Sequence, residues 1–312
     1  MNGALKVVAA IVPVSLGMSI LVPTTAHAEA PTIVNLNDVT GTQAIYYAGY
    51  AEPNGQLMSQ DTSRISSANA SAVPVGVEQT SPADTWYVGS TTLNNPSDYP
   101  QTMTTQSFSR AINTTLSTTL TTGLSTTTTA KFAAPAGGAG VDLAQTISFS
   151  QAETQTTSDQ QTYTASAQNI LVPPHMKAQV YVVLQSVKAV GNIGLHADLI
   201  GNGDYKVKNC SPPSNDACIG QNLTNVPLYD LLGPNTKYGT AKYHPPALPS
   251  TFSLNPATRT VIFDGTGKYT ATYGTDMSVS VDLTPIDAQS GDSSSQPAPT
   301  PYSYSVTPKV SG

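Results

Sequence analysis

The apolar residues between positions 108 and 149 are sorted by odd and even residue number. From Phe108 to Phe132, every Leu, Ile and Phe occupies an even position, while the odd positions hold mostly Ser and Thr, together with Lys131. Successive side chains of a β-strand point to opposite faces of its sheet. The sorting therefore predicts a long strand with one apolar and one hydroxyl-rich face, and it argues against a disordered linker.

A second arm shows the same sorting with the opposite parity. Its apolar residues are odd-numbered, with Gln145 as the exception, and they are Val141, Leu143, Ile147 and Phe149. The intervening segment 135–140, PAGGAG, is rich in glycine, as tight turns are. We therefore expect one β-hairpin. The register that keeps both apolar faces together pairs Phe132 with Val141, Ala130 with Leu143, Thr126 with Ile147, Leu124 with Phe149, and Lys131 with Asp142.

The hairpin matches the pattern of a membrane-spanning strand pair. Each arm supplies the roughly 9–11 residues that a tilted spanning strand needs, and one face is apolar while the other is polar. A lone hairpin would leave backbone groups unpaired in hydrocarbon, so several chains would each have to contribute one. A hairpin of an ordinary soluble sheet shows the same alternation. The pattern alone leaves a soluble β-sandwich and a pore-forming protein open, and it disfavours a mucin-like stalk.

The N-terminus predicts export. Lys6 precedes an apolar run, and small residues at Ala26 and Ala28 follow it. This order is typical of a signal peptide, with cleavage expected after Ala28. A membrane anchor is the alternative, but the run is short for a spanning helix and contains Pro13. We expect a secreted protein.

Composition favours strands over helices. Pro (24) and Gly (23) punctuate the chain, Thr, Val and Tyr are common, and no long segment has helical periodicity. The net charge is −6 and only 10% of residues are charged, which argues against nucleic acid as a partner. In an exported chain, Cys210 and Cys218 predict a local disulfide. No ligand spacing for a metal appears, and no cofactor is expected.

The chain divides by composition into five parts. These are the signal peptide 1–28, an N-terminal head 29–95, a central region 96–205 that contains the hairpin 118–150, a C-terminal β region 206–288 with the Cys210–Cys218 loop, and a linker and tail 289–312. In the central region, Ile193, Leu195, Ala197 and Leu199 alternate with smaller or polar residues and predict a half-buried strand. Residues 289–301, QSGDSSSQPAPTP, have the composition of a flexible linker.

Several segments together resemble a known family. They are AKF-x-x-P before the turn and G-V-x-L after it, a Thr/Gln/Ser arm, ILVP before an alternating strand, and V-x-GN-x-x-L with a closing glycine. The segment VGSTTLNNPSDYPQTMTTQSFS extends the similarity upstream. This part, 85–203, is similar to the epsilon-toxin/Mtx2 family of aerolysin-type β-pore-forming toxins. The parts before 85 and after 205 agree only in their all-β character.

The resemblance implies an all-β, elongated, aerolysin-like body of long antiparallel strands with an insertable hairpin. The protein would be a secreted protoxin, activated by a protease, that forms a homo-oligomeric ring on a target-cell membrane. Two sets of hairpin residues follow from it. An apolar set would face lipid: Leu120, Leu124, Ala130, Phe132, Val141, Leu143, Ile147 and Phe149. A polar set would line the lumen: Thr119, Thr121, Ser125, Thr127, Thr129, Lys131, Asp142, Thr146 and Ser148.

The receptor is unknown, and five aromatic residues are candidates for binding it: Tyr46, Tyr47, Tyr50, Trp86 and Tyr87. They equally fit the core of a β domain. The tail 289–312 is a candidate C-terminal propeptide. The alternative function is a secreted aerolysin-like binding module, such as a lectin or adhesin, that never inserts into a membrane.

An enzyme is the rival from another class. Beyond the predicted signal peptide, the chain has only His175, His196 and His244, and none forms a metal-binding or catalytic motif. The segment GTGK at 265–268 lacks the spacing of a phosphate-binding loop. We expect structural roles for His175 and His196, and no catalytic site.

Overall fold

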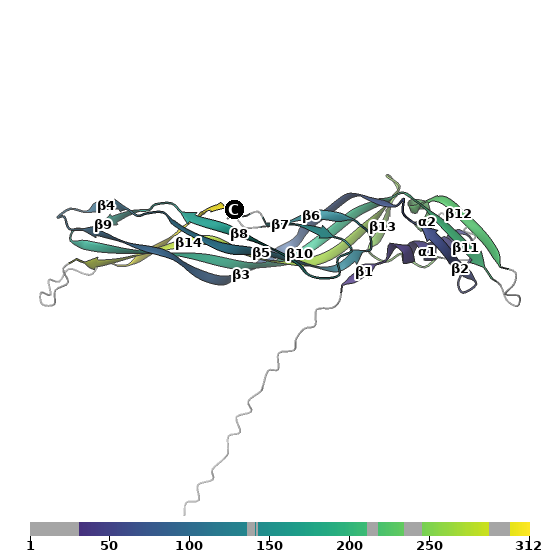
Figure 1. Cartoon of the computed structure of the whole chain (residues 1–312), viewed down its shortest axis with the longest axis horizontal. Coiled ribbons are helices and arrows are strands. Elements are labelled where there is room, and N and C mark those ends of the chain that lie inside the picture. The colour runs from purple at the N-terminus through teal and green to yellow at the C-terminus, as the bar shows by residue number, and fades with distance from the viewer. Residues whose placement is uncertain (1–30, 136–140, 142, 211–217, 234–244, 287–299) are drawn as a thin grey trace, which may run out of the picture.

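The computed structural model describes residues 31–135, 141, 143–210, 218–233, 245–286 and 300–312. The predicted signal peptide and His244 lie outside these residues, as do most of the linker and the residues between the two cysteines. The molecule is long and narrow and is built almost wholly from strands (Figure 1). This confirms the predicted all-β, elongated fold with long antiparallel strands.

Three long strands form the body. β10 (Met176–Ile200) pairs antiparallel with β3 (Ser66–Asn95) on one side and with β14 (Thr260–Pro285) on the other. At about 3.3 Å per residue, 25 residues of β10 span roughly 80 Å. Side chains of β10 alternate between buried and less buried, and Ile193, Leu195, Ala197 and Leu199 are all buried. The half-buried strand predicted from their alternation is therefore confirmed.

The free edge of β14 receives three partners in succession. β13 (Phe252–Asn255), β5 (Phe108–Leu124) and β15 (Tyr302–Val306) pair with its beginning, middle and end. β5 pairs next with β8 (Gln155–Ala165), and β8 with β16 (Lys309–Ser311). β1 (Thr32–Val34) runs parallel to the end of β5. Together these strands make one nine-stranded sheet.

The two ends of the body carry smaller sheets. At one end lie β4 (Gln101–Thr104) and β9 (Asn169–Val172), which pair with each other (Figure 1). At the other end, β2 (Gly55–Asp61), β11 (Asn202–Asn209) and β12 (Ile219–Pro227) form a three-stranded sheet next to helices α1 (Leu36–Tyr47) and α2 (Leu228–Leu232). We call this second group the head. β6 (Thr129–Ala134) and β7 (Leu143–Ser148) form a separate two-stranded sheet.

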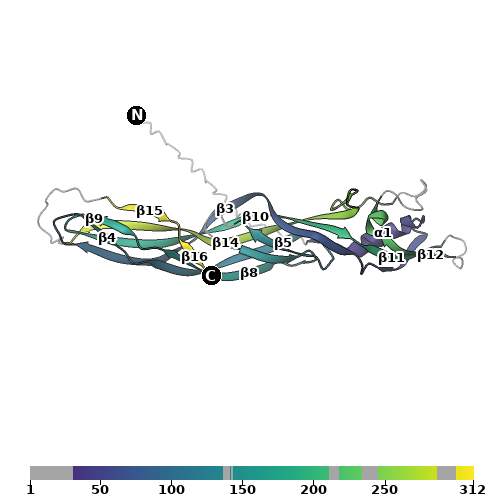
Figure 2. The same cartoon turned by 90° about the horizontal axis from the view of Figure 1, so that it is seen from above.

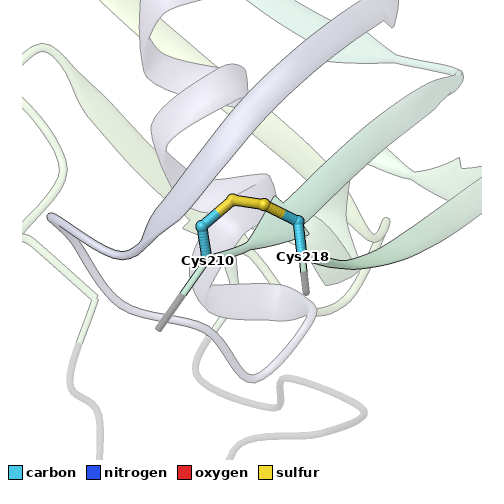
Figure 3. Close-up of a disulfide and its surroundings, with 2 residues drawn as sticks. All are labelled: Cys210 and Cys218. Atoms are coloured by element: carbon cyan, nitrogen blue, oxygen red, sulfur yellow. A yellow bond between two sulfur atoms is a disulfide. The ribbon is translucent and has the colours of Figure 1, made fainter. Parts of the chain in front are cut away.

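The chain passes from the body into the head at Gly201. Its φ of +119° is one that side chains rarely allow, and a Cβ there would lie 2.1 Å from the Arg64 carbonyl oxygen. The head also contains the Cys210–Cys218 disulfide, which confirms the predicted pairing (Figure 3).

The helix α1 was not expected from the sequence. Its segment, LNDVTGTQAIYY, carries β-branched residues and a glycine, which disfavour a helix. Most of its residues are buried in the head, so tertiary packing outweighs the weak propensity. A local signal exists, because the Asn35 side chain accepts a hydrogen bond from the Asn37 amide as an N-cap.

The sheets group the chain differently from the expected division. β3 falls within the expected head range 29–95, yet it pairs with β10 along the body. The head combines residues 36–61 with residues 202–232. The reason is topological, because antiparallel strands of the body bring segments distant in sequence to the same end of the molecule.

Candidate functional site: a hairpin docked on the body

The tract from β5 to β8 contains two ladders with different registers. In the outer ladder, β5 pairs with β8 from Phe108–Ala165 to Thr118–Gln155. In the inner ladder, β6 pairs with β7, and Thr129 lies opposite Ser148. Continuing the outer register would place Thr129 opposite Ala144. The inner strands are therefore shifted by four residues against the outer ones.

The predicted inner pairing is wrong by this shift. Phe132 lies opposite Gln145 rather than Val141, and Ala134 rather than Ala130 lies opposite Leu143. The physical reason is an excursion of the first arm at residues 125–128, which no strand includes. Because the shift is an even number, the predicted faces are unchanged. The expected pair of Lys131 with Asp142 cannot be traced, since Asp142 lies outside the described residues.

Burial separates the two predicted sets of residues. All eight members of the apolar set are buried, with between 0% and 7% of their surface exposed. The described members of the polar set are exposed or only half-buried, and Lys131 and Thr146 are among the exposed ones. The apolar face of the hairpin thus lies against the body and its polar face points to solvent. Which side would face lipid stays a prediction.

Aromatic contacts join the hairpin to the body. The rings of Phe132 and Tyr269 lie 5.2 Å apart, and those of Phe149 and Phe263 lie 6.2 Å apart, both within the range of favourable ring pairs. Tyr269 and Phe263 both belong to β14. The middle of the body sheet therefore provides the surface on which the hairpin rests (Figure 1).

Tyr269 is itself held by a second strand. Its hydroxyl donates a hydrogen bond of 2.7 Å to Glu78 Oε2 on β3. To reach it, the ring crosses Gly191 of β10, where a Cβ would lie only 2.6 Å from the ring. Burial raises the pKa of the Tyr269 hydroxyl above its ordinary value, and the Glu78 carboxylate raises it further. This support could not be predicted from the sequence, because no local pattern connects residues 78, 191 and 269.

One polar group is buried beneath the hairpin. Gln145, the exception in the apolar arm, is 5% exposed, and its Nε2 donates to Thr118 Oγ1 at 3.2 Å. Its Oε1 has no partner among the described residues. An unpaired buried acceptor costs about 1–3 kcal/mol. The docked state is therefore less stable than the apolar contacts alone would make it.

The five candidate receptor aromatics do not form one cluster. Tyr46, Tyr47 and Tyr50 lie at α1 in the head, whereas Trp86 pairs with Leu184 in the middle of the body. From Leu184 to the head end of β10 at Ile200 is roughly 50 Å at about 3.3 Å per residue. Tyr47 is buried. Trp86 lies half-buried under the Arg110 guanidinium, and the neighbouring Tyr87 is exposed.

The two described histidines form surface pairs with aspartates. His175 Nε2 lies 2.8 Å from Asp98 Oδ1, and His196 Nδ1 lies 2.8 Å from Asp264 Oδ1 on the neighbouring strand. Within the described part of the chain, no three His, Cys, Asp or Glu residues gather as a metal site would require. No helix among these residues is long and apolar enough to cross a membrane.

The C-terminal tail is a further element that the sequence did not place. β15 pairs with β14 at residues 277–281, and β16 pairs with β8 at Thr162–Thr164, so the tail connects two strands of the body sheet (Figure 2). Tyr302, Tyr304 and Val306 alternate with serines, which is a weak strand signal. Their partners could not be read from it.

Comparison with solved structures finds the same fold in toxin-related proteins. The Mpp75Aa1.1 β-pore-forming protein from Brevibacillus laterosporus is 19% identical with a TM-score of 0.56, over 88% of this chain and 96% of that one. A non-toxic crystal protein from Bacillus thuringiensis is 18% identical with a TM-score of 0.57, over 83% and 100%. A chain of the Cry23Aa1–Cry37Aa1 binary complex is 18% identical with a TM-score of 0.53, over 89% of this chain and 99% of that one. At these identities the likeness shows the fold alone.

Comparison at the level of sequence identifies the family. No curated protein sequence matched the chain. Residues 34–295 match the family described as Clostridium epsilon toxin ETX/Bacillus mosquitocidal toxin MTX2. The match covers the head, the docked hairpin and the long strands of the body, but not β15 and β16. It includes the parts before 85 and after 205 where the sequence had shown little similarity. The chain therefore belongs to the ETX/MTX2 toxin family.

Proposed function

We propose that this chain is a secreted β-pore-forming toxin whose β6–β7 hairpin leaves the body and inserts into a target membrane. The observation that carries the proposal is the docked hairpin itself. Its described residues form one buried apolar face and one hydroxyl-rich exposed face, and they share no backbone ladder with the body sheet. Side-chain contacts and a few hydrogen bonds hold it, and those can be exchanged for lipid without breaking the long strands.

Insertion requires several copies of the chain. The edges of a single hairpin would leave amide and carbonyl groups unpaired in hydrocarbon, at several kilocalories per mole for each group. A homo-oligomeric ring, in which each copy contributes one hairpin, closes the ladder. In such a barrel, apolar residues of the inserted segment face lipid: Ala130, Phe132, Val141, Leu143, Ile147 and Phe149. Its polar residues line the lumen: Ser125, Thr127, Thr129, Lys131, Asp142, Thr146 and Ser148. The remaining members of the two sets, Thr119, Leu120, Thr121 and Leu124, stay on β5 in the body sheet.

The tail 289–312 fits the role of a C-terminal propeptide. β15 and β16 occupy edge positions on β14 and β8, which would otherwise present unpaired backbone groups. A protease cut in the linker before Tyr302 would allow the tail to leave. Neighbouring copies could then pair with the freed edges. A chain ending at residue 286 should form SDS-resistant oligomers on liposomes without protease, and the full chain should not.

The head is the proposed receptor-binding part, and secretion follows from the predicted signal peptide 1–28. Tyr46 and Tyr50 remain candidates for receptor contact, since both are half-buried at the head. Tyr87 is exposed on the body and is a separate candidate. Single alanine variants of the three, assayed for cell binding, would distinguish the head from the body as the contact surface.

Dye release tests the proposal. Liposomes and cells loaded with a fluorescent dye are exposed to the chain with and without protease treatment. Protease-treated protein should release the dye and form an SDS-resistant oligomer. The alternative is a binding module that never inserts, and one protein of the same fold is described as non-toxic. Binding to cells with neither release nor oligomer under any activation would support that alternative.

A further inference from the structure

The outer and inner ladders of the hairpin tract are out of register by four residues, although contacts of the outer register continue beyond its last pair. Thr119 Oγ1 lies 2.7 Å from Thr154 Oγ1, and the Leu124 amide donates to the Phe149 carbonyl oxygen at 2.8 Å. Both pairs belong to the register of β5–β8. The register therefore changes in one step, immediately after Leu124.

Residues 125–128 produce this step. The Phe149 carbonyl oxygen accepts from the Leu124 amide, and the Phe149 amide donates to the Thr128 carbonyl oxygen at 2.9 Å. The residues between Leu124 and Thr128 therefore have no backbone partner on the described part of the second arm. The Thr126 amide turns back to the Leu124 carbonyl oxygen at 2.8 Å. We call this segment the bulge.

The body and the first residue of α1 in the head, rather than the hairpin, stabilise the bulge. The Ser125 amide donates to the Val34 carbonyl oxygen, and Ser125 Oγ accepts from the Leu36 amide at 3.1 Å. Thr128 Oγ1 donates to Ser67 Oγ on β3 at 2.8 Å. Each of these contacts would be lost once the hairpin leaves the body. The backbone groups of the bulge would then have lost the hydrogen-bond partners that the docked state provides.

A bilayer makes the bulge untenable. Backbone groups that lack a partner cannot be left in hydrocarbon. The ladder of β6 and β7 is also too short, with 6 residues in each strand against the roughly 9–11 that a spanning strand needs. Extending the outer register through residues 125–128 removes both defects, because it gives one uninterrupted ladder from Thr119–Thr154 to Phe132–Val141.

We propose that the hairpin slides by four residues during insertion, so that the inner strands adopt the register of β5–β8. An even shift leaves every side chain on the same face. It also improves the pairing on the apolar face. Gln145 leaves its position opposite Phe132 and comes opposite Thr128, whose hydroxyl can bond its amide, while Phe132 comes opposite Val141. Residues 125–128, which no strand includes in the docked state, thus become part of the paired strand after the slide.

Two cysteine pairs distinguish the registers. Lys131→Cys with Thr146→Cys joins residues that are opposite in the docked hairpin, whereas Thr127→Cys with Thr146→Cys joins residues that are opposite only after the slide. All three side chains are exposed, so neither pair should disturb folding. Each protein is oxidised once in solution and once after protease treatment on liposomes. Cross-linking is read on denaturing gels.

The slide rests on the proposed insertion of the hairpin. Dye release by the wild-type chain measures that insertion separately from the cross-links, which measure the register. In solution, the 131/146 pair should cross-link and the 127/146 pair should not. In membrane-bound oligomers, the 127/146 pair should cross-link and the 131/146 pair should not. Chains already cross-linked at 131/146 should release less than a tenth of the dye until reduced, with the wild type under the same reductant as control. Cross-linking at 131/146 within the membrane, or at neither pair while the wild type releases dye, would overturn the slide.

Discussion

β5–β8 and β6–β7 belong to one continuous tract with one alternating pattern, but the body holds them in different ways. β5 pairs through its backbone with β8 on one side and with β14 on the other. Within the described part of the chain, β6 and β7 pair only with each other. Their apolar face is buried by side-chain contacts, and a few hydrogen bonds at the bulge complete the attachment.

The difference shows how a sequence pattern can encode a removable element. Alternation provides both segments with an apolar face, so both are buried. Only the inner segment can leave without breaking a ladder of the body sheet. Its attachment includes a buried acceptor with no partner among the described residues, and a bulge that contacts outside the hairpin stabilise. We therefore expect the free energy of local opening to be low in this part of the molecule, as it is in regions that move.

The strongest test of the comparison is a covalent lock on the inner segment. Ser67 Oγ and Thr128 Oγ1 are 2.8 Å apart, so Ser67→Cys with Thr128→Cys should form a disulfide between β3 and the hairpin. Dye release should fall at least a hundredfold and return on mild reduction. The matched control is Ser109→Cys with Thr164→Cys, whose hydroxyls are 2.9 Å apart across β5–β8. If that control blocks release equally, the two segments do not differ as described.

Removing one anchor of the apolar face should weaken the inner segment alone. Phe132 is fully buried against Tyr269, and truncating a buried Phe to Ala costs about 3–5 kcal/mol. Phe132→Ala should accelerate amide hydrogen exchange in β6 and β7 while exchange in β14 stays slow. Leu116→Ala in β5 is the comparison, because it removes a buried side chain from the outer segment. Equal acceleration in β14 for both variants would show one cooperative unit.

Replacing the buried amide should have the opposite effect. Gln145→Leu removes the acceptor that has no partner among the described residues, together with the 3.2 Å hydrogen bond to Thr118, and adds apolar contact. The net effect should stabilise the docked hairpin by about 1–2 kcal/mol. Dye release should become roughly tenfold slower, since about 1.4 kcal/mol corresponds to a factor of ten. Gln155→Leu, at an exposed position of β8, should leave the rate unchanged. Faster release by Gln145→Leu would contradict the assigned cost.

The smallest expected effect concerns the support beneath the hairpin. The pKa of Tyr269 is raised in the folded state by burial and by Glu78. The unfolded state ionises this hydroxyl at about pH 10, whereas the folded state keeps its proton. Its stabilising contribution is therefore complete below pH 10 and declines as the pH rises above that value. In urea titrations, the wild type should have a larger free energy of unfolding than Tyr269→Phe, and this difference in free energy should become smaller between pH 9 and pH 11. A constant difference would exclude a specific role for the hydroxyl.

The features that the sequence predicted correctly are those that depend on a local pattern of residues. Parity separated the buried from the more exposed members of the two predicted sets among the described hairpin residues, and two cysteines in one loop indicated their disulfide. The predicted pairing of Leu124 with Phe149 was right, but the pairing of the inner strands was wrong. The bulge that shifts them depends on Val34, Leu36 and Ser67, which are remote in sequence. Helix α1 was missed for a similar reason, since burial in the head determines it. No local pattern could place the tail on β14 and β8.

The central claim is that β6–β7 lines a pore, and planar-bilayer current tests it most directly. Lys131 is an exposed member of the polar set on β6, and Lys268 is exposed on β14 in the body. Protease-treated wild type should give discrete conductance steps. In a salt gradient, Lys131→Glu should shift the reversal potential toward cation selectivity, and Lys268→Glu should not. Absence of steps, or an equal shift in both variants, would contradict the account.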